Sequence, residues 1–536
     1  MQTWNKKTVW TLGMLLLLGG GVLNGAVDPR TYKPPPFPEA ENHLRVPFLP
    51  MERDWERLDI YVPKAATNGP LPCVVLVYGG GWGGKVMFPL DNVRRLLKEG
   101  YVVALADYVL GAQNPLPITV WDVGAGIRFL RKNAAQYRID PERIGAMGWS
   151  AGGWLVQLLA PSDSATLWGN LIWGDKHEYS PGVPVRYVPM VEPHPVNTEQ
   201  SATVCAAITD WGAKMIGPGT SRNIADAKTW LGPNDPPLFT CAPLAKDFIQ
   251  PGPKGYRDAG AICEEARIGR KEKTGEIVPV NKNPGDYGHC YVGVVGGGDT
   301  VTWDATGKEI AFGDRTLQFL DKYVKNPEFA CSPEMFPQGG AVFGEVPVIL
   351  RTVHPNAAIH FTTDGTEPTD KSPVYRQPVP VTPGMTLKAI AIKPGRKPSP
   401  VTTALFTKAS CAPPVILAEQ KVYRVKVGEP FSVTFKAKCD KPVDWQLSGK
   451  IAAKALEAID TNKDNSRVKR TKPWLAMDSA SGTMSGTADG PSVNVLIIAA
   501  NVVDGKTVLC DARQFIVVVE EGSVPARTDR KDVDQK

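Results

Sequence analysis

The chain carries a serine between glycines at Gly148-Trp149-Ser150-Ala151-Gly152, after an apolar run with the pattern of a buried strand and before a segment with a helical pattern. A backbone that passes from strand to helix within so few residues must turn sharply. The neighbours of the serine must then have almost no side chain, because a larger group would clash with the strand. The segment therefore predicts a strand-turn-helix unit that exposes the Ser150 hydroxyl.

A glycine-rich loop follows another buried-strand pattern, at residues 73–77, and reads Tyr-Gly-Gly-Gly-Trp-Gly-Gly from Tyr78 onwards. This loop is nearly all backbone, so several N–H groups can point to one place. Acyl transfer needs such donors, because they stabilise the oxyanion of the tetrahedral intermediate. We expect the N–H groups of Gly80, Gly81 and Ala151 to form this oxyanion hole. A phosphate-binding loop is the alternative, but no Gly-Lys-Ser/Thr follows.

Helical patterns alternate with strand patterns from residue 27 to residue 328, which is typical of a doubly wound α/β sheet. The predicted helices span residues 91–99, 120–133 and 314–324. A stretch rich in proline, tryptophan and charge interrupts the alternation at about residues 161–201. About 40 residues without strong periodicity more often form a functional cap than a plain surface loop. We therefore expect an insertion over the active site.

Four segments of this region resemble the lipase and esterase branch of the α/β-hydrolases. They are Tyr78-Gly-Gly-Gly-Trp82, Ala106-Asp107-Tyr108, Asp140-Pro-Glu-Arg-Ile144 and Gly148-Trp-Ser-Ala-Gly-Gly153. The resemblance covers roughly residues 55 to 325 and is closest to secreted carbohydrate esterases that remove acetyl or feruloyl groups from xylan. It implies a serine esterase. The family usually has a histidine that supports the glycine loop where this chain has Tyr78, so the change bears on loop geometry and substrate preference.

In this fold the catalytic base follows the serine along the chain, in the order Ser, Asp or Glu, His. His289 lies in the glycine-rich stretch Gly-Asp-Tyr-Gly-His, which resembles the Gly-x-x-His segment of the family, and we predict it as the base. The other histidines after Ser150 lie in a proline-rich stretch or in a later β-rich region: His177, His194, His354 and His360.

Asp247 is the predicted acid of the triad. It follows a strand pattern at residues 237–241, and its Asp-x-x-x-Pro sequence resembles the Asp-x-x-Val-Pro turn of the family. It would orient His289 and stabilise its cation without itself taking a proton. Asp286 and Asp258 are the alternatives. The serine would attack an ester carbonyl while the histidine takes its proton, and water would release the acyl-enzyme, with no metal or organic cofactor.

The N-terminal residues predict a secretory signal over residues 1–26. Lys6 and Lys7 precede an apolar stretch at residues 12–23, and small residues follow it up to Ala26. The apolar stretch is too short to span a membrane, so we expect a secreted or periplasmic protein with no membrane span after signal removal; an uncleaved anchor is the alternative. The formal net charge of +6 is small for 536 residues and gives no nucleic-acid signature.

Beyond the α/β region, short alternating runs separated by glycine and proline predict two immunoglobulin-like β-sandwich domains, at residues 332–409 and 412–520. A disordered tail is expected at residues 521–536. Residues 359–368 resemble the chitobiase/β-hexosaminidase C-terminal domain, and residues 474–487 resemble immunoglobulin or cadherin-like domains of bacterial surface proteins. Both likenesses are short, and the domains could bind glycan or act as spacers.

The nine cysteines allow disulfides in an exported chain. Cys331 and Cys411 bracket the first sandwich, while Cys439 and Cys510 lie on strand-like segments of the second, which suggests local pairs. Three cysteines in apolar strand patterns are expected to be core thiols: Cys73, Cys205 and Cys241. Three aromatic side chains could stack on sugar rings but more often belong to a sandwich core: Trp445, Trp474 and Tyr375.

These patterns together predict a secreted serine ester hydrolase that acts on acylated polysaccharide or oligosaccharide. Three alternatives remain. A small-ester carboxylesterase would use the same triad, and a prolyl-oligopeptidase-like peptidase shares the serine motif but normally follows a β-propeller, which this chain does not show. The alternative of another class is a glycan-binding or adhesion protein with an inactive hydrolase domain. The oligomeric state is left open.

Overall fold

The computed structural model describes fifteen stretches of the chain between residues 32 and 521. They are residues 32–49, 56–65, 69–80, 85, 90–110, 116–159, 185–187, 196–210, 232–243, 256–279, 300–304, 306–418, 420–450, 474–504 and 507–521. The predicted signal lies outside them, as do most of the expected insertion and almost all of the expected tail. No helix among these stretches is long and apolar enough to cross a membrane.

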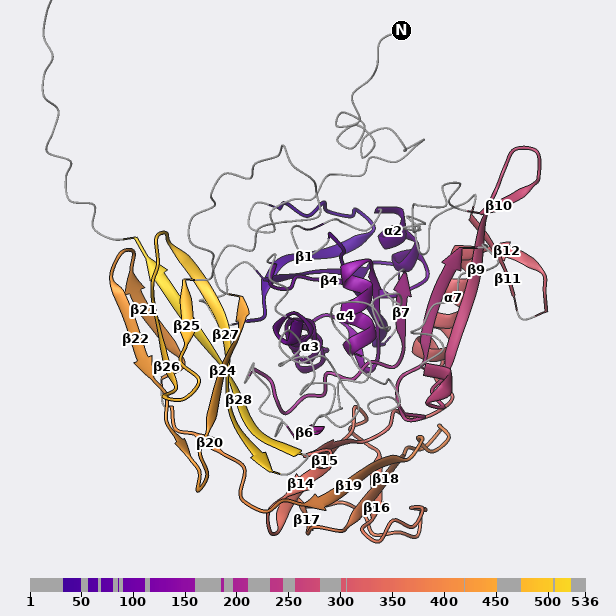
Figure 1. The fold of residues 1–536 in the computed structure, drawn as a ribbon. Helices are drawn as coiled ribbons and strands as arrows, with labels where there is room; N and C mark the ends of the chain where they lie inside the picture. Colours follow the sequence, from indigo (N-terminus) through magenta and orange to yellow (C-terminus); the bar gives the residue numbers. More distant parts are fainter. Residues whose placement is uncertain are drawn as a thin grey trace, which may run out of the picture.

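The α/β region is built on one eleven-stranded sheet, with strand order β1-β2-β4-β3-β5-β7-β8-β9-β11-β12 and β10 paired to β9 (Figure 1). Its strands are β1 Ala40–Pro47, β2 Arg57–Pro63, β3 Leu71–Val77, β4 Val102–Ala106, β5 Ile139–Trp149, β7 Ala207–Asp210, β8 Leu238–Pro243, β9 Cys263–Lys271, β10 Ile277–Pro279, β11 Thr300–Trp303 and β12 Glu309–Ala311. The six central strands from β4 to β9 run parallel, and antiparallel strands extend both edges.

Helices cover both faces of this sheet. They are α2 Leu90–Lys98, α3 Leu116–Lys132, α4 Ala151–Leu159 and α7 Phe312–Leu320, the last continued by a π-helical turn, η4, at Asp321–Lys325. Val75 and Val77 of β3 pack in the apolar cluster of α3 and α4, whereas Val74 and Leu76 pack in that of α2 and α7. Side chains alternate along a strand, so both faces of β3 must be apolar. The predicted doubly wound α/β-hydrolase fold class is confirmed.

The helix bounds differ slightly from the predicted ones. The largest difference is in α3, which begins at Leu116 rather than at residue 120. Pro117 stands in the first turn, where a helix has no acceptor for the backbone N–H that proline lacks, so proline starts this helix instead of delaying it. The predicted helix at 314–324 is divided between α7 and η4.

Two β-sandwiches follow the α/β region along the chain, which confirms this part of the predicted fold class. The first contains β13 Glu334–Phe336, β14 Gly340–Val342, β15 Val346–Arg351, β16 Ala358–Thr362, β17 Val379–Val381, β18 Thr386–Ile392 and β19 Thr402–Lys408. The second contains β20 Val415–Ile416, β21 Val422–Lys426, β22 Pro430–Thr434, β23 Ala437–Lys438, β24 Asp444–Lys450, β25 Leu475–Met477, β26 Thr483–Thr487, β27 Ser492–Asp504 and β28 Thr507–Glu520. Each sandwich encloses its own apolar core.

The aromatic side chains considered as sugar platforms belong to these cores. Trp445 and Trp474 are 6% and 4% exposed and pack inside the second sandwich. Tyr375 packs, partly buried, against the core of the first. The core interpretation is therefore confirmed for the two tryptophans, whereas Tyr375 lies at the border of its core and stays partly exposed.

The local disulfides suggested by the sequence are wrong. All eight cysteines in the described stretches are thiols. The two cysteines of the second sandwich lie in different apolar clusters: Cys510 packs with Val109 and Ile118 of the α/β region, whereas Cys439 packs with Cys411. The three cysteines expected to be core thiols are buried: Cys73, Cys205 and Cys241.

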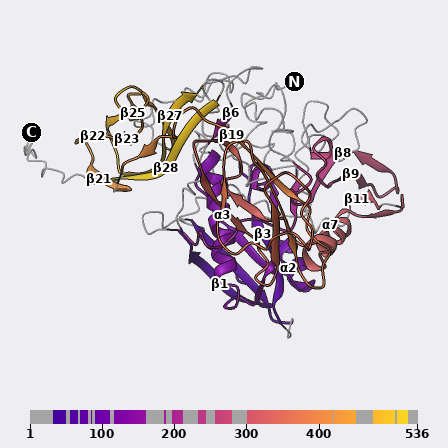
Figure 2. The same cartoon turned by 90° about the horizontal axis from the view of Figure 1, so that it is seen from below.

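Both sandwiches pack directly on the α/β region (Figures 1 and 2). Val495 and Ile497 of β27 contact Val109 and Ile118, which follow β4 and begin α3. A short strand of the expected insertion, β6 at Val185–Tyr187, pairs in parallel with β28. The expected insertion thus adds a strand to the sheet of the second sandwich.

Candidate active site

Ser150 occupies a strained turn between β5 and α4. Its φ is +52°, in the left-handed region that residues with a Cβ rarely adopt. Such a conformation costs about 1–3 kcal/mol and persists only where the surrounding structure enforces it. The Ser150 carbonyl accepts the first helical hydrogen bond, from the N–H of Trp154 at 3.1 Å, so the serine caps α4. The predicted strand-turn-helix unit is therefore confirmed.

Close backbone contacts explain the glycines around this serine. A Cβ on Gly152 would lie 2.1 Å from the carbonyl oxygen of Val77, because the first turn of α4 packs on the end of β3. A Cβ on Gly148 would lie 2.3 Å from the carbonyl oxygen of Gly152. A Cβ on Gly79 would lie 3.0 Å from the Ser150 Cβ. The serine and the start of the glycine loop are thus brought into direct contact.

Two of the three predicted oxyanion donors lie in the described stretches. Gly80 follows the end of β3 and has φ +129°, a conformation suited to glycine alone. Ala151 is the first residue of α4, and the N–H groups of the first helical turn have no acceptor within their own helix. Ala151 thus directly follows Ser150, and Gly80 directly follows Gly79, whose backbone packs on Ser150; their role as oxyanion donors stays a prediction. Gly81, the third predicted donor, lies outside the described residues.

The predicted acid and base, Asp247 and His289, also lie outside the described residues, as does Asp286. The strands that flank these residues in the sequence are described. β8 runs parallel to β5 and ends at Pro243, so both strands end at the same edge of the sheet, and Asp247 follows β8 in the sequence. His289 comes between β10 and β11, before α7. The placement of Asp247 and His289 beside Ser150 stays a prediction.

The structure separates Asp258 from Ser150. Asp258 is exposed and lies two residues after Tyr256, whose hydroxyl donates to the carbonyl oxygen of Gln157 at 3.1 Å. Gln157 is seven residues along α4 from Ser150, a distance of about 10 Å along the helix axis. Asp258 therefore stands near the far end of α4, which counts against it as the triad acid.

A buried ion pair beside the glycine loop was not anticipated. The Lys85 ammonium lies 2.6 Å from Asp107 Oδ1 and 3.7 Å from Asp59 Oδ2, and all three side chains are at most 1% exposed. Arg45 also pairs with Asp107, at 2.6 Å. Burial raises the pKa of Asp59 above its usual value, although the Lys85 charge opposes the shift. Lys85 follows the glycine loop, so this cluster holds the end of the loop against β2 and β4.

Tyr78 anchors the start of the same loop. Its ring stacks on that of Tyr108 with centroids 4.5 Å apart, and the Tyr108 hydroxyl donates to the Tyr78 carbonyl oxygen at 3.0 Å. The Tyr78 ring also lies 5.2 Å from the Lys85 ammonium. The tyrosine that replaces the family's histidine is therefore a fully packed support. The sequence signal for this cluster was the Ala106-Asp107-Tyr108 motif, to which no role had been assigned.

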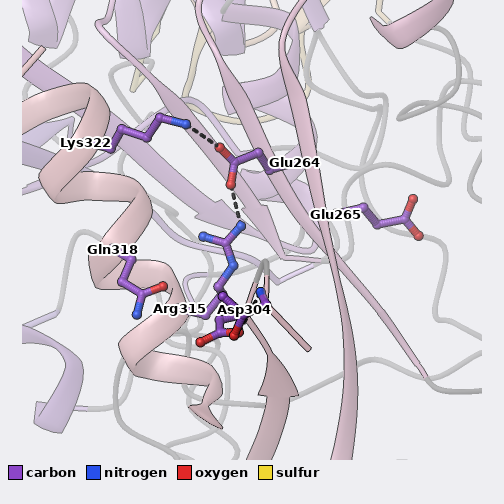
Figure 3. A pocket seen from close by; sticks show the side chains of 7 residues that line it. Glu264, Glu265, Asp304, Arg315, Gln318 and Lys322 are labelled. Atoms are coloured by element: carbon purple, nitrogen blue, oxygen red, sulfur yellow. Dashed lines mark hydrogen bonds and ion pairs between the residues drawn. The ribbon is translucent and has the colours of Figure 1, made fainter. Parts of the chain in front are cut away.

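A charged hollow of about 550 Å³ lies on the other side of the α/β region (Figure 3). It is bordered by β9, the turn before β12 and α7. Figure 3 shows Arg315 of α7 and Lys322 of η4 both directed at Glu264 of β9, the lysine at 3.3 Å. Burial opposes ionisation of Glu264, but its partners, Arg315 first, lower its pKa overall. These charges join α7 and η4 to β9. The residues that line the hollow include none of the predicted site residues.

Comparisons with known families match two parts of the chain. The BD-FAE family model matches residues 58–189, which include both the glycine loop and the Ser150 turn. The chitobiase/beta-hexosaminidase C-terminal domain model matches residues 337–403, within the first sandwich.

Several curated proteins are similar to a part of this chain. The probable isoprenylcysteine alpha-carbonyl methylesterase ICMEL1 of Arabidopsis thaliana is 41% identical over 98 residues, which is 18% of this chain and 20% of that protein. The carboxylesterase NlhH of Mycobacterium tuberculosis is 35% identical over 103 residues, 19% of this chain and 32% of the relative. The chain thus spans less than a third of the length of either relative.

Solved structures are also similar to a part of this chain. A truncated carbohydrate esterase from gut microbiota is 20% identical with a TM-score of 0.34, covering 45% of this chain and 89% of that one. Esterase 2 of Thermogutta terrifontis, with propionate bound, is 20% identical with a TM-score of 0.31, covering 42% and 82%.

Proposed function

We propose that the chain is a serine ester hydrolase in which Ser150 is the nucleophile. The observation that carries the proposal is the left-handed Ser150 backbone between β5 and α4, with the backbone of Gly79 packed against it. This arrangement exposes a hydroxyl beside N–H groups of a helix N-terminus and a glycine loop. The BD-FAE match covers both segments, and curated relatives of part of the chain are named as esterases.

The chemistry follows from these positions. The Ser150 hydroxyl attacks the ester carbonyl, and His289, held by Asp247, takes its proton and returns it to the leaving alcohol. The oxyanion of the tetrahedral intermediate accepts hydrogen bonds from the N–H groups of Gly80, Gly81 and Ala151. Water then attacks the acyl-serine while His289 takes its proton. A second tetrahedral intermediate collapses, the proton returns to the Ser150 oxygen, and the acid is released.

The substrate that we propose is an acyl group, acetyl or feruloyl, on a polysaccharide such as xylan, and the site of action is outside the cytoplasm. The resemblance to secreted carbohydrate esterases and the match of the first sandwich to the chitobiase/beta-hexosaminidase C-terminal domain support this choice. A small-ester carboxylesterase would use the same residues. Because the sandwich tryptophans are buried, the polysaccharide preference would come from the catalytic region and its insertion.

The test is acid release by residues 27–536 from acetylated and feruloylated xylan and from an aryl acetate. We expect Ser150→Ala to reduce the rate at least about a thousandfold, and Ser485→Ala, an exposed serine of the second sandwich, to leave it unchanged. Release from the aryl ester alone would favour the small-ester enzyme. Xylan binding without release of any acid would favour the binding protein, and an active Ser150→Ala would contradict the proposal.

A further inference from the structure

The contact between the α/β region and the first sandwich is buried and polar. Glu142 of β5 pairs with three side chains of the sandwich: His354 Nδ1 lies 3.2 Å away, Arg396 Nη2 lies 3.6 Å away, and Lys393 completes the set. The Nε2 atom of His354 accepts a hydrogen bond from the N–H of Cys331 at 2.8 Å. The residue at which the sandwich begins is therefore fixed against the hydrolase sheet.

A second group of contacts fixes the segment that leads into β7. The Ser201 hydroxyl donates to Glu334 of the first sandwich at 2.6 Å, and Glu334 pairs with Arg351 at 2.7 Å. Arg131 of α3 donates to the carbonyl oxygen of Thr203 at 2.9 Å. The residues just before Cys205 are thus held from both sides of the interface.

Two cysteine sulfurs lie close together between these two groups of contacts. Cys205 Sγ and Cys331 Sγ are 3.8 Å apart, although the residues are 126 positions apart in the chain. A disulfide needs about 2.05 Å, so the sulfurs must close by about 2 Å, which small side-chain rotations supply. Cys205 Sγ donates to the Glu142 carbonyl oxygen at 3.0 Å, which holds it beside the interface. Cys331 is partly exposed, so an oxidant can reach the pair from its side.

We propose that Cys205 and Cys331 form a disulfide that joins the hydrolase region covalently to the first sandwich. The oxidant is a disulfide donor, such as oxidised glutathione or a thiol oxidase. Cys331, whose pKa is raised by its hydrogen bond to Cys205 and by burial, first gives its proton to the Cys205 thiolate beside it. The Cys331 thiolate then attacks one donor sulfur and releases a thiol, which takes the proton from Cys205, leaving a mixed disulfide on Cys331. The Cys205 thiolate then attacks the Cys331 sulfur and releases the second thiol. The cysteines lose two protons and two electrons, and the donor disulfide is reduced to two thiols.

The surroundings favour the second step. In the reduced pair, the hydrogen bond from Cys331 and then the positive charges of Arg131 and Arg396 lower the pKa of Cys205 against the effect of burial. Once Cys331 is in the mixed disulfide it has no S–H to donate, and the two arginine charges are what still favour the Cys205 thiolate. A thiolate is the attacking species in disulfide exchange, so these charges assist closure. Because the polar contacts on both sides already hold the two chain segments, closing the bond requires little further ordering.

The test uses the full chain, first reduced and then incubated with excess oxidised glutathione. Free thiols are blocked with N-ethylmaleimide under denaturing conditions, and the protein is digested without reduction. We expect mass spectrometry to find the Cys205 peptide joined to the Cys331 peptide. The linked species should disappear in Cys331→Ser and persist in Cys263→Ser, a partly exposed cysteine of β9.

The wild-type digest decides the proposal even where a variant folds poorly. Recovery of both peptides in the blocked, unlinked form after oxidation would overturn it. So would either cysteine joined to a different cysteine. The proposal is independent of esterase activity, so a protein without activity could still carry this bond.

Discussion

Ser150 keeps its strained backbone because three glycines leave room for it. The first turn of α4, the end of β5 and the start of the loop after β3 meet at distances that a Cβ would prevent. The strain of about 1–3 kcal/mol is offset by the burial of α4, whose nine residues are all buried. Catalytic geometry at this residue therefore depends on the smallest side chains around it.

A Gly152→Ala substitution tests this dependence. The new Cβ would meet the Val77 carbonyl oxygen at 2.1 Å, and neither β3 nor α4 can move without disturbing the sheet. We expect a loss of about 3 kcal/mol in the stability of the α/β region, a lower Tm and little remaining esterase activity. Thermal unfolding followed by circular dichroism measures the effect. Gly490→Ala, where a Cβ meets open space, should change stability by under about 0.5 kcal/mol. Equal Tm values for the two variants would contradict the argument.

At the scale of elements, the glycine loop is held at both ends by buried side chains. The stacked pair Tyr78 and Tyr108 holds its start, and Lys85 holds its end by pairing with Asp107. A loop made of glycine has many accessible conformations, so fixed ends reduce the entropy that must be lost to position its donors. We infer that this cluster positions the oxyanion hole.

Lys85→Met should therefore lower kcat as well as stability. Removing the ammonium leaves the buried carboxylates of Asp59 and Asp107 without their shared partner, which costs about 3–5 kcal/mol. We expect kcat on an aryl acetate to fall more than KM rises, since the donors act on the transition state. Circular dichroism first identifies the folded protein. Initial-rate assays of that protein then separate the effect on kcat from the effect on stability. Lys98→Met, an exposed lysine of α2, is the control. An unchanged kcat in folded Lys85→Met would refute a positioning role.

At the scale of the whole molecule, the α/β region contacts the two sandwiches through two interfaces of different chemistry. The contact of the α/β region with the first sandwich is polar and centred on Glu142, whereas its contact with the second sandwich is apolar and centred on Val109 and Ile118. A polar interface responds to pH more than an apolar one, because its groups titrate.

The pH dependence follows from His354. Burial lowers its pKa from 6.5 to about 4 in the folded protein, so the neutral imidazole is favoured by folding. The resulting stability is fully present above pH 6.5 and is lost as the pH falls towards 4, by about 2–3 kcal/mol. Tm measured between pH 4 and 8 should show this decline. In His354→Gln the slope between pH 4 and 6.5 should be shallower. If Tm fell with pH as steeply in His354→Gln as in the wild type, the pH dependence of stability would come from other groups.

Local patterns were enough to predict the strands around Ser150, the alternation of helices and strands, and the sandwich character of the later region. The start of α3 was predicted four residues too late because the preference of proline for the first turn of a helix was not considered. The disulfide pairs were wrong because position along the chain does not show which face of a strand a cysteine occupies. Lys85 was missed because a lysine after a glycine loop has the pattern of an exposed residue.

The sequence alone determined what depends on neighbours in the chain: the glycines that permit the serine turn, the apolar runs that become central strands, and the order of the motifs. Tertiary structure decided which distant groups share one buried volume. It placed Lys85 beside Asp107, Cys205 beside Cys331, and the sheet of the second sandwich against α3. The physical reason is that steric limits on the backbone act between adjacent residues, whereas burial and charge pairing depend on the whole fold.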